Sequence, residues 1–358
     1  MTGFDYGNAR LRAMKSRLLS RRVLESLVEA RTLRGLITAL TKTAYRNSVE
    51  TALAHTSGMA CINEALREDL GKTLGSVRDF YQEEAAEIIA IVLWAYDTQN
   101  LKVILRGLDK NATTGDILAA LVPIGTLDYS TLTVLARAKS IRSAADMLAS
   151  LGSPFARPLM ELRAELPGAD AIRMELALEQ WRFREAGKFL QEQSHNEDVL
   201  SSAIQMEADL TNLFTALRFA YAPEERKRLR EWSGTQDLER IFVNAGVIPH
   251  ALLLEAGMQD SLEAAVNVLA STPYGPYLKA GMQVFARNGR LSSLERQLRR
   301  YQLEWLSQKI AKDPLGVGVL LGYFALKINE INNLRWIAHG IGLGLEPKEI
   351  LTELEFLS

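Results

Sequence analysis

A long internal repeat is the feature that most constrains how this chain of 358 residues can fold. The segment Ser140–Ser150 aligns with Ser261–Ser271, 121 residues later, with Ser, Ala, Leu, Ala and Ser recurring in place. One third of the chain is about 119 residues, so the period fits three copies. Solenoid repeats are only about 20–50 residues long, so each copy is expected to be a domain and not a single helix pair.

A second motif occurs three times and consists of an acid, two further residues, Asn and Leu. Its copies span 97–101, 209–213 and 330–334, so they lie 112 and 121 residues apart. On a helix, the Asn and Leu of each copy share a face with the residues one turn later. We expect the motif to pack and tie helices within each domain, with direct contact to a partner as the alternative. The residues concerned are Asp97, Asn100, Asp209, Asn212, Glu330 and Asn333.

Composition and periodicity together predict an all-α fold. Leu, Ala, Glu and Arg dominate, runs of β-branched residues are short, and apolar residues recur at helical spacing. No Asn-Gly or Asp-Gly step joins two alternating strands, so evidence for hairpins is missing. Pro123 and Pro249, each in a short break, mark the expected starts of the second and third copies. The predicted domains are 1–121, 122–246 and 247–358.

The sequence contains no complete motif for catalysis, nucleotide binding or metal binding. Gly71-Lys72-Thr73 resembles the end of a phosphate-binding loop, but Leu66 stands where that loop needs a glycine. A single cysteine, Cys61, excludes an intrachain disulfide and a Cys-rich zinc site, and the four histidines form no His-x-x-x-His pair. We expect no catalytic residue, cofactor, metal or small-molecule substrate. A helical enzyme, the alternative, would need a polar cluster in a pocket.

Membrane insertion is not expected from the sequence. The longest apolar stretches, Ile88–Tyr96 and Gly316–Leu326, fall short of the roughly 20 residues that a spanning helix needs. The first residues lack the basic and then apolar pattern of a secretory signal. The chain is therefore expected to be soluble and, at most, to sit on a membrane or a membrane protein.

Positive charge is concentrated near the start of the chain. The whole chain has 42 Lys and Arg against 43 Asp and Glu, whereas residues 1–46 hold ten bases and three acids. Such a segment is either a solvated helix face or a docking surface for an acidic partner or anionic lipid. Nucleic acid is disfavoured because aromatic residues do not alternate with the bases. We predict a helix with Leu11, Leu18 and Leu19 toward the core. Its bases, predicted to contact partner subunits or lipid headgroups, are Arg10, Arg12, Lys15 and Arg17.

Both ends of the sequence resemble one family. The segment Tyr6–Leu19 is similar to the opening of the C subunit of archaeal and bacterial V/A-type ATP synthases. The segment Lys327–Gly340, followed by Gly344–Glu346, resembles the end of the same protein. The eukaryotic counterpart is the d subunit of the vacuolar ATPase.

The resemblance implies both a fold and a task. The fold is a funnel of three similar helical domains around a pseudo-threefold axis. The task is that of a non-catalytic part of the central stalk, which couples a rotating shaft to a membrane rotor ring for ATP-linked transport of protons or sodium ions. The implied partners are the shaft subunits and the proteolipid subunits of the ring, with anionic lipid headgroups in addition. The implied location is peripheral, on the cytoplasmic face of the cell membrane. The alternative is a helical-repeat scaffold or adaptor unrelated to ATPases.

Overall fold

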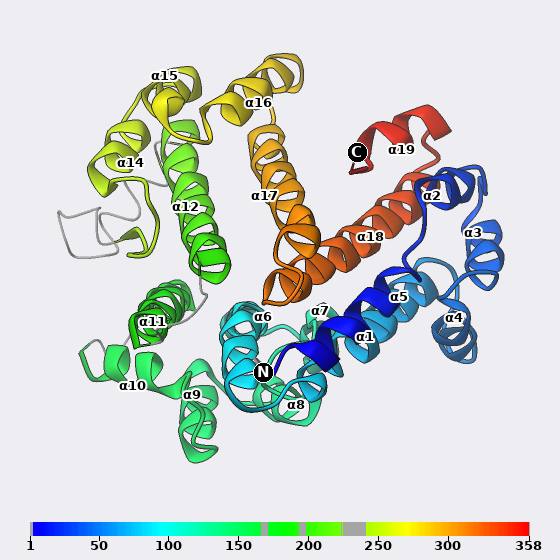
Figure 1. Ribbon diagram of the computed structural model, residues 1–358, viewed down its shortest axis with the longest axis horizontal. Helices are drawn as coiled ribbons and strands as arrows, with labels where there is room; N and C mark the ends of the chain where they lie inside the picture. The colour runs from blue at the N-terminus through cyan, green and yellow to red at the C-terminus, as the bar shows by residue number, and fades with distance from the viewer. Residues whose placement is uncertain (1–2, 166–170, 193–197, 223, 225–240, 358) are drawn as a thin grey trace. The chain divides into compact units, whose positions relative to one another are not determined.

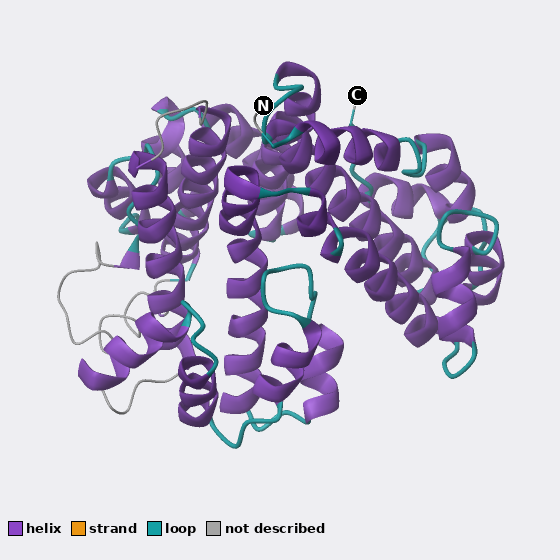
Figure 2. Cartoon of the chain, turned by 60° about the horizontal axis from the view of Figure 1, so that its bottom comes forward, coloured by secondary structure: helices purple, strands orange, loops and turns teal. Residues whose placement is uncertain are grey.

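The computed structural model describes residues 3–165, 171–192, 198–222, 224 and 241–357 (Figure 1). Eighteen α-helices and two 3-10 helices make up the regular structure of these residues, which contain no strand (Figure 2). The predicted all-α class is confirmed. Contacts group the chain into two compact units: unit 1 is residues 1–175 with 306–358, and unit 2 is residues 176–305.

The helices of each unit are as follows. Unit 1 holds α1 (Asp5–Lys15), α2 (Arg21–Val28), α3 (Leu33–Leu40), α4 (Arg46–Leu53), α5 (Gly58–Gly75), η1 (Val77–Phe80), α6 (Glu83–Asp109), α7 (Thr114–Ala120), α8 (Tyr129–Ala136), α9 (Ile141–Ser150), α10 (Ala156–Glu165), α18 (Gly318–Gly342) and α19 (Pro347–Glu353). Unit 2 holds α12 (Asp198–Tyr221), α14 (His250–Gly257), α15 (Leu262–Val268), η3 (Leu269–Ser271) and α16 (Gly275–Asn288). Two helices, α11 (Ala171–Glu192) and α17 (Ser292–Lys312), begin in one unit and end in the other.

The aligned segments of the sequence repeat are capped helices. Ser140 and Ser261 are the N-cap residues of α9 and α15, and each side chain accepts a hydrogen bond from the backbone N–H three residues later. Such caps satisfy a helix N–H that has no partner within the helix. The apolar positions Leu148 and Leu269 are both buried. The repeat therefore reflects one way of starting and packing a short helix.

Three long helices carry the acid–x–x–Asn–Leu motif. In each case shorter helices pack on the motif-bearing helix: α7, α8 and α9 on α6, α14 and α15 on α12, and α1, α2, α3, α5 and α19 on α18. In unit 2 the core between them is closed by Leu213, Leu217, Leu253, Leu278 and Leu294. The predicted division into 1–121, 122–246 and 247–358 remains a prediction.

Helix α6 is the one described helix that is long and apolar enough, by length and composition, to cross a membrane. Within the most apolar part of this helix, 56% is buried inside the protein. Asp97 and Asn100 lie in the middle of α6 and are both buried. Such burial is typical of a core helix in a helical protein.

The N-terminal helix is shorter than predicted. It ends at Lys15, and the backbone N–H groups of Arg17 and Leu18 bond to carbonyls three residues earlier, as in a tight final turn. The N–H of Leu19 is bonded to the carboxylate of Glu330, 311 residues away. This long-range bond draws the chain out of the helix. Leu11 is fully buried, whereas Leu18 and Leu19 are half-buried.

The same side-chain bond recurs on all three long helices. The carboxamide of Asn100 donates to the carbonyl of Val122 at 2.8 Å and accepts from its N–H at 2.8 Å. Asn212 bonds in both directions with Val243, at 3.0 and 2.8 Å, and Asn333 with Glu355, at 3.0 and 2.9 Å. A carboxamide carries a donor and an acceptor side by side, so it can pair with a peptide group as another strand would. All three Asn side chains are buried.

Replacing Asn333 by Ala should lower the free energy of unfolding of unit 1 by about 1–3 kcal/mol, because the N–H of Glu355 loses its partner. The carbonyl of Glu355 keeps a second donor, Asn329 Nδ2, at 3.0 Å. The neighbouring Asn332 is exposed on the same helix and provides the matched control. Asn332→Ala should change the free energy by no more than about 0.5 kcal/mol. Urea unfolding followed by circular dichroism measures both, and equal effects would contradict this account.

Candidate functional site

The acid of the motif on α6, and likewise on α12, bonds to the same loop as the Asn of that motif. Asp97 accepts from the N–H and hydroxyl of Thr126, both at 2.7 Å, and from the N–H of Leu127 at 2.9 Å. Asp209 accepts from the N–H of Ile248 at 3.1 Å and from the hydroxyl of Tyr274 at 2.9 Å. Acid and Asn together therefore bind one loop at two points.

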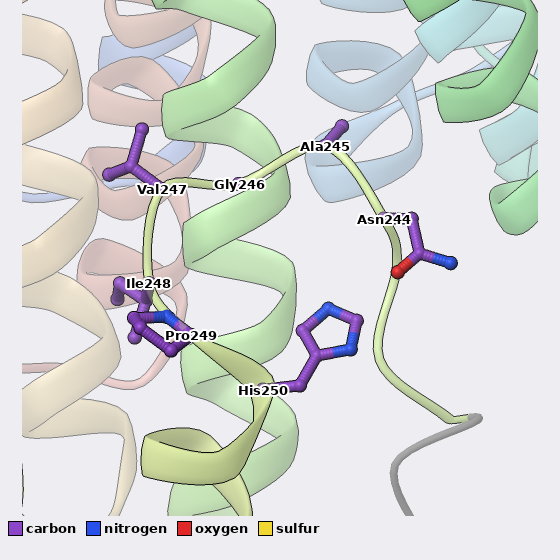
Figure 3. A pocket seen from close by; sticks show the side chains of 7 residues that line it. All are labelled: Asn244, Ala245, Gly246, Val247, Ile248, Pro249 and His250. Atoms are coloured by element: carbon purple, nitrogen blue, oxygen red, sulfur yellow. The ribbon is translucent and has the colours of Figure 1, made fainter.

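Two glycines allow these loops to approach the helix. A Cβ atom on Gly125 would lie 1.9 Å from Oδ1 of Asp97, and one on Gly246 would lie 2.1 Å from Oδ1 of Asp209. No side chain fits at such distances, so glycine is required for the close approach. Figure 3 shows the loop around Gly246 running alongside α12. The sequence reasoning missed both glycines, although each lies within three residues of Pro123 or Pro249.

On α18 the two ends of the chain take the place of the loop. Asn333 holds Glu355 near the C-terminus, whereas Glu330 accepts from the N–H of Leu19 near the N-terminus. The guanidinium of Arg21 lies 4.7 Å from the ring centre of Phe356. Figure 1 shows α2, in blue, beside α19, in red, and contacts between their residues agree. The two partner segments of the third motif are thus far apart in the chain and do not belong to one loop.

A buried ionic cluster surrounds Glu330. The ammonium of Lys327 lies 3.0 Å from Glu330, 2.8 Å from Asp69 and 2.9 Å from the hydroxyl of Tyr45. That hydroxyl donates to Glu330 at 2.6 Å. Burial, followed by the two carboxylates, raises the pKa of Tyr45, and burial also raises the pKa of Asp69. The cluster joins α18 to α5 and to the residue that precedes α4.

Two arginines that follow the motif form ion pairs. Arg106 makes a bidentate pair with Glu175, at 2.6 and 2.5 Å, and Arg218 lies 3.4 Å from Glu295. Each arginine stands six residues after its Asn, where the third copy has His339. His339 is exposed. The third copy therefore lacks an arginine at this position and instead has the cluster around Lys327.

The four predicted partner-binding bases are all exposed, but they do not share one face. Arg10 donates to the hydroxyl of Tyr6 at 2.8 Å and lies 4.1 Å from the ring centre of Phe80. Arg12 donates to the carbonyl of Pro314, on the other side of α1. Lys15 ends the helix and Arg17 lies beyond it, so the prediction that one helix carries all four bases is wrong for Arg17.

The described residues offer little to a metal or small ligand. Among them no group of three or more His, Cys, Asp or Glu could hold a metal ion, and His195 lies outside the described residues. A shallow hollow borders residues 244–250 (Figure 3), where His250 Nε2 lies 3.2 Å from the carbonyl of Val243. Cys61 is buried, and burial raises the pKa of its thiol.

Burial dominates the electrostatics of the two motif aspartates. Burial raises the pKa of Asp97, against the opposing effect of hydrogen bonds from Thr126 and Leu127. Burial likewise raises the pKa of Asp209, although Ile248 and Tyr274 donate to it. The folded protein therefore holds these two protons more tightly than the unfolded chain does.

Replacing Asp209 by Asn should change how stability depends on pH. Because the folded pKa of Asp209 lies above its ordinary value of 3.8, its contribution is greatest below pH 3.8 and declines as pH rises through the folded pKa. The free energy of unfolding of the native chain, relative to Asp209→Asn, should therefore fall as pH rises above 3.8 and through the folded pKa. Urea titrations across this range measure it, with the exposed Asp198→Asn on α12 as the control for the lost charge. A difference that grows with pH would contradict the raised pKa.

Comparisons with known proteins bear on what this arrangement is. A family model described as ATP synthase (C/AC39) subunit matches residues 7–353. The C subunit of the A-type ATP synthase of Thermococcus onnurineus is 27% identical over 352 residues, which cover 98% of this chain and 89% of the relative. The C subunit of Thermococcus kodakarensis is 24% identical, over 98% of this chain and 89% of the relative. That of Methanocaldococcus jannaschii is 23% identical, over 97% of this chain and 85% of the relative. The resemblance inferred from the two ends is confirmed, and the chain belongs to the ATP synthase (C/AC39) subunit family.

Proposed function

We propose that the chain is the central-stalk C subunit of an A-type rotary ATP synthase. In this role it couples the rotating shaft to the membrane rotor ring for ATP-linked transport of protons or sodium ions. The observation that carries the proposal is the family match across residues 7–353, with C subunits of A-type ATP synthases aligned over nearly their whole lengths. A scaffold unrelated to ATPases does not fit that match.

The proposed role is mechanical and not catalytic. A coupling protein must transmit force between partners, so its helices have to resist displacement relative to one another. The buried two-way bonds of Asn100, Asn212 and Asn333 support this proposal, since breaking them exposes unpaired backbone groups. The three-domain division and the funnel belong to the same proposal, with one motif helix in each domain.

The proposed partners are the shaft subunits and the proteolipid subunits of the ring, at the cytoplasmic face of the cell membrane. The test is affinity purification of the tagged chain from its native membrane, followed by mass spectrometry. Recovery of shaft and ring subunits together is the expected result. A purification that contains neither, while the tagged chain is intact and folded, would refute the proposal.

The isolated chain should neither bind nor hydrolyse MgATP. Leu66 occupies the position of the glycine that a phosphate-binding loop needs, and the segment containing Gly71-Lys72-Thr73 lies within helix α5. Calorimetric titration with MgATP should show no saturable heat. Binding at micromolar concentrations would show that the chain has a nucleotide site.

Replacing Arg10, Arg12, Lys15 and Arg17 by Gln should weaken association with the membrane sector or the shaft by about tenfold or more at low salt. Single exposed pairs contribute only about 0.2–1 kcal/mol, but 1.4 kcal/mol already corresponds to a factor of ten. The difference should shrink toward 1 M salt, where the Debye length is about 3 Å.

The matched control removes the same number of charges from exposed bases elsewhere in residues 1–46, namely Arg31, Arg34, Lys42 and Arg46. Binding of both variants to each partner is measured by co-sedimentation across a salt series. If the two variants bind equally, charge near α1 has no special role in assembly.

A further inference from the structure

The loop between α17 and α18 carries an exposed apolar side chain. Lys312, Pro314 and Leu315 are exposed, and the side chain of Leu315 is 65% accessible to solvent. Leu315 is the second most exposed large apolar residue in the described part of the chain. The loop therefore places one exposed apolar side chain near an exposed lysine.

The one acid of this loop is turned inward. Asp313 accepts from the N–H of Gly318 at 2.7 Å. A Cβ atom on Gly316 or Gly318 would lie 2.4 or 2.7 Å from the Asp313 side chain, so both glycines make room for it. The apolar residues and the lysine of the loop are therefore exposed to solvent, while its negative charge faces the start of α18.

Helix α1 adds two further positive charges beside the loop. Asn8 donates to the carbonyl of Gly316 at 3.0 Å, and Arg12 donates to the carbonyl of Pro314. Asn8, Arg12 and Lys15 follow one another at four and three residues, which places them along one edge of the helix. Arg12 and Lys15 are exposed. Leu315 thus stands next to an edge of α1 that carries cations.

We propose that this surface, the Leu315 tip, binds the face of an anionic lipid bilayer. The tip consists of Lys312, Pro314 and Leu315 with Arg12 and Lys15. Bases near an anionic membrane are attracted to its phosphates, while an apolar side chain is accepted among the headgroups and upper acyl chains. A bilayer needs no pocket in the protein to accept the leucine. Arg12 and Lys15 also belong to the bases proposed to contact partner subunits, so the lipid contact is tested with the purified chain in the absence of those subunits.

An exposed leucine at the other end of α18 provides a matched control. Leu343 is 77% accessible, so it is at least as exposed as Leu315. The residues that follow it carry two exposed acids, Glu346 and Glu349, and one exposed base, Lys348. A bilayer with negative headgroups should attract the Leu315 tip and not this second leucine.

The experiment is co-sedimentation of the purified full chain with sucrose-loaded vesicles. One set contains phosphatidylcholine alone, and the other contains phosphatidylcholine with phosphatidylglycerol. The native chain should bind the anionic vesicles preferentially. Arg12→Gln, Lys15→Gln and Lys312→Gln together should weaken this binding by up to about a hundredfold. Leu315→Ser should weaken it several-fold, and Leu343→Ser should leave it unchanged.

A second measurement reports whether residue 315 itself enters the bilayer. A Leu315→Cys variant made in a Cys61→Ala background and labelled with an environment-sensitive fluorophore should show a blue shift with anionic vesicles only. Equal binding to both vesicle sets, or an equal loss in Leu315→Ser and Leu343→Ser, would overturn the proposal. So would absence of vesicle binding by a chain that still co-purifies with shaft and ring subunits, and the tip would then be assigned to a protein partner. That last outcome leaves the coupling role intact.

Discussion

An asparagine carboxamide paired with a backbone peptide group is the interaction on which the rest of this fold depends. It occurs once on each of α6, α12 and α18, and in each case the partner segment leads to or from the short helices packed on that long helix. The acid one turn earlier adds a second point of attachment. Because the three Asn side chains are buried, breaking their bonds leaves polar groups away from water at a free-energy cost. The arrangement resists sliding of the short helices along the long ones.

The third copy shows what happens when no loop is available. Glu355 and Leu19 come from opposite ends of the chain, so only non-covalent contacts hold the N-terminal helices to α18. The cluster of Lys327, Glu330 and Asp69 lies at this junction. A buried ion pair adds little net stability, but removing one partner leaves a charge buried and unpaired. We infer that this cluster favours one register of the N-terminal helices over others.

The sequence predicted the helical class and the motif positions but not the partners of the motif. Spacing identified Asn100, Asn212 and Asn333, since a recurring polar residue in an apolar run is visible in the sequence. Their partners, Val122, Val243 and Glu355, bond through backbone atoms, so the residue type at these positions does not indicate the bond. The end of α1 at Lys15 was missed for a related reason: apolar spacing continues through Leu18, but the bond between Leu19 and Glu330 ends the helix.

The central claim is that the first helices complete the α18 bundle without relying on chain continuity. A protease site inserted after the exposed Gln82, just before α6, tests this directly in the full chain. After cleavage, the fragment up to residue 82 should remain bound to the rest of the chain through gel filtration at neutral pH, with unchanged helical content. Separation of the two fragments under native conditions would contradict the account.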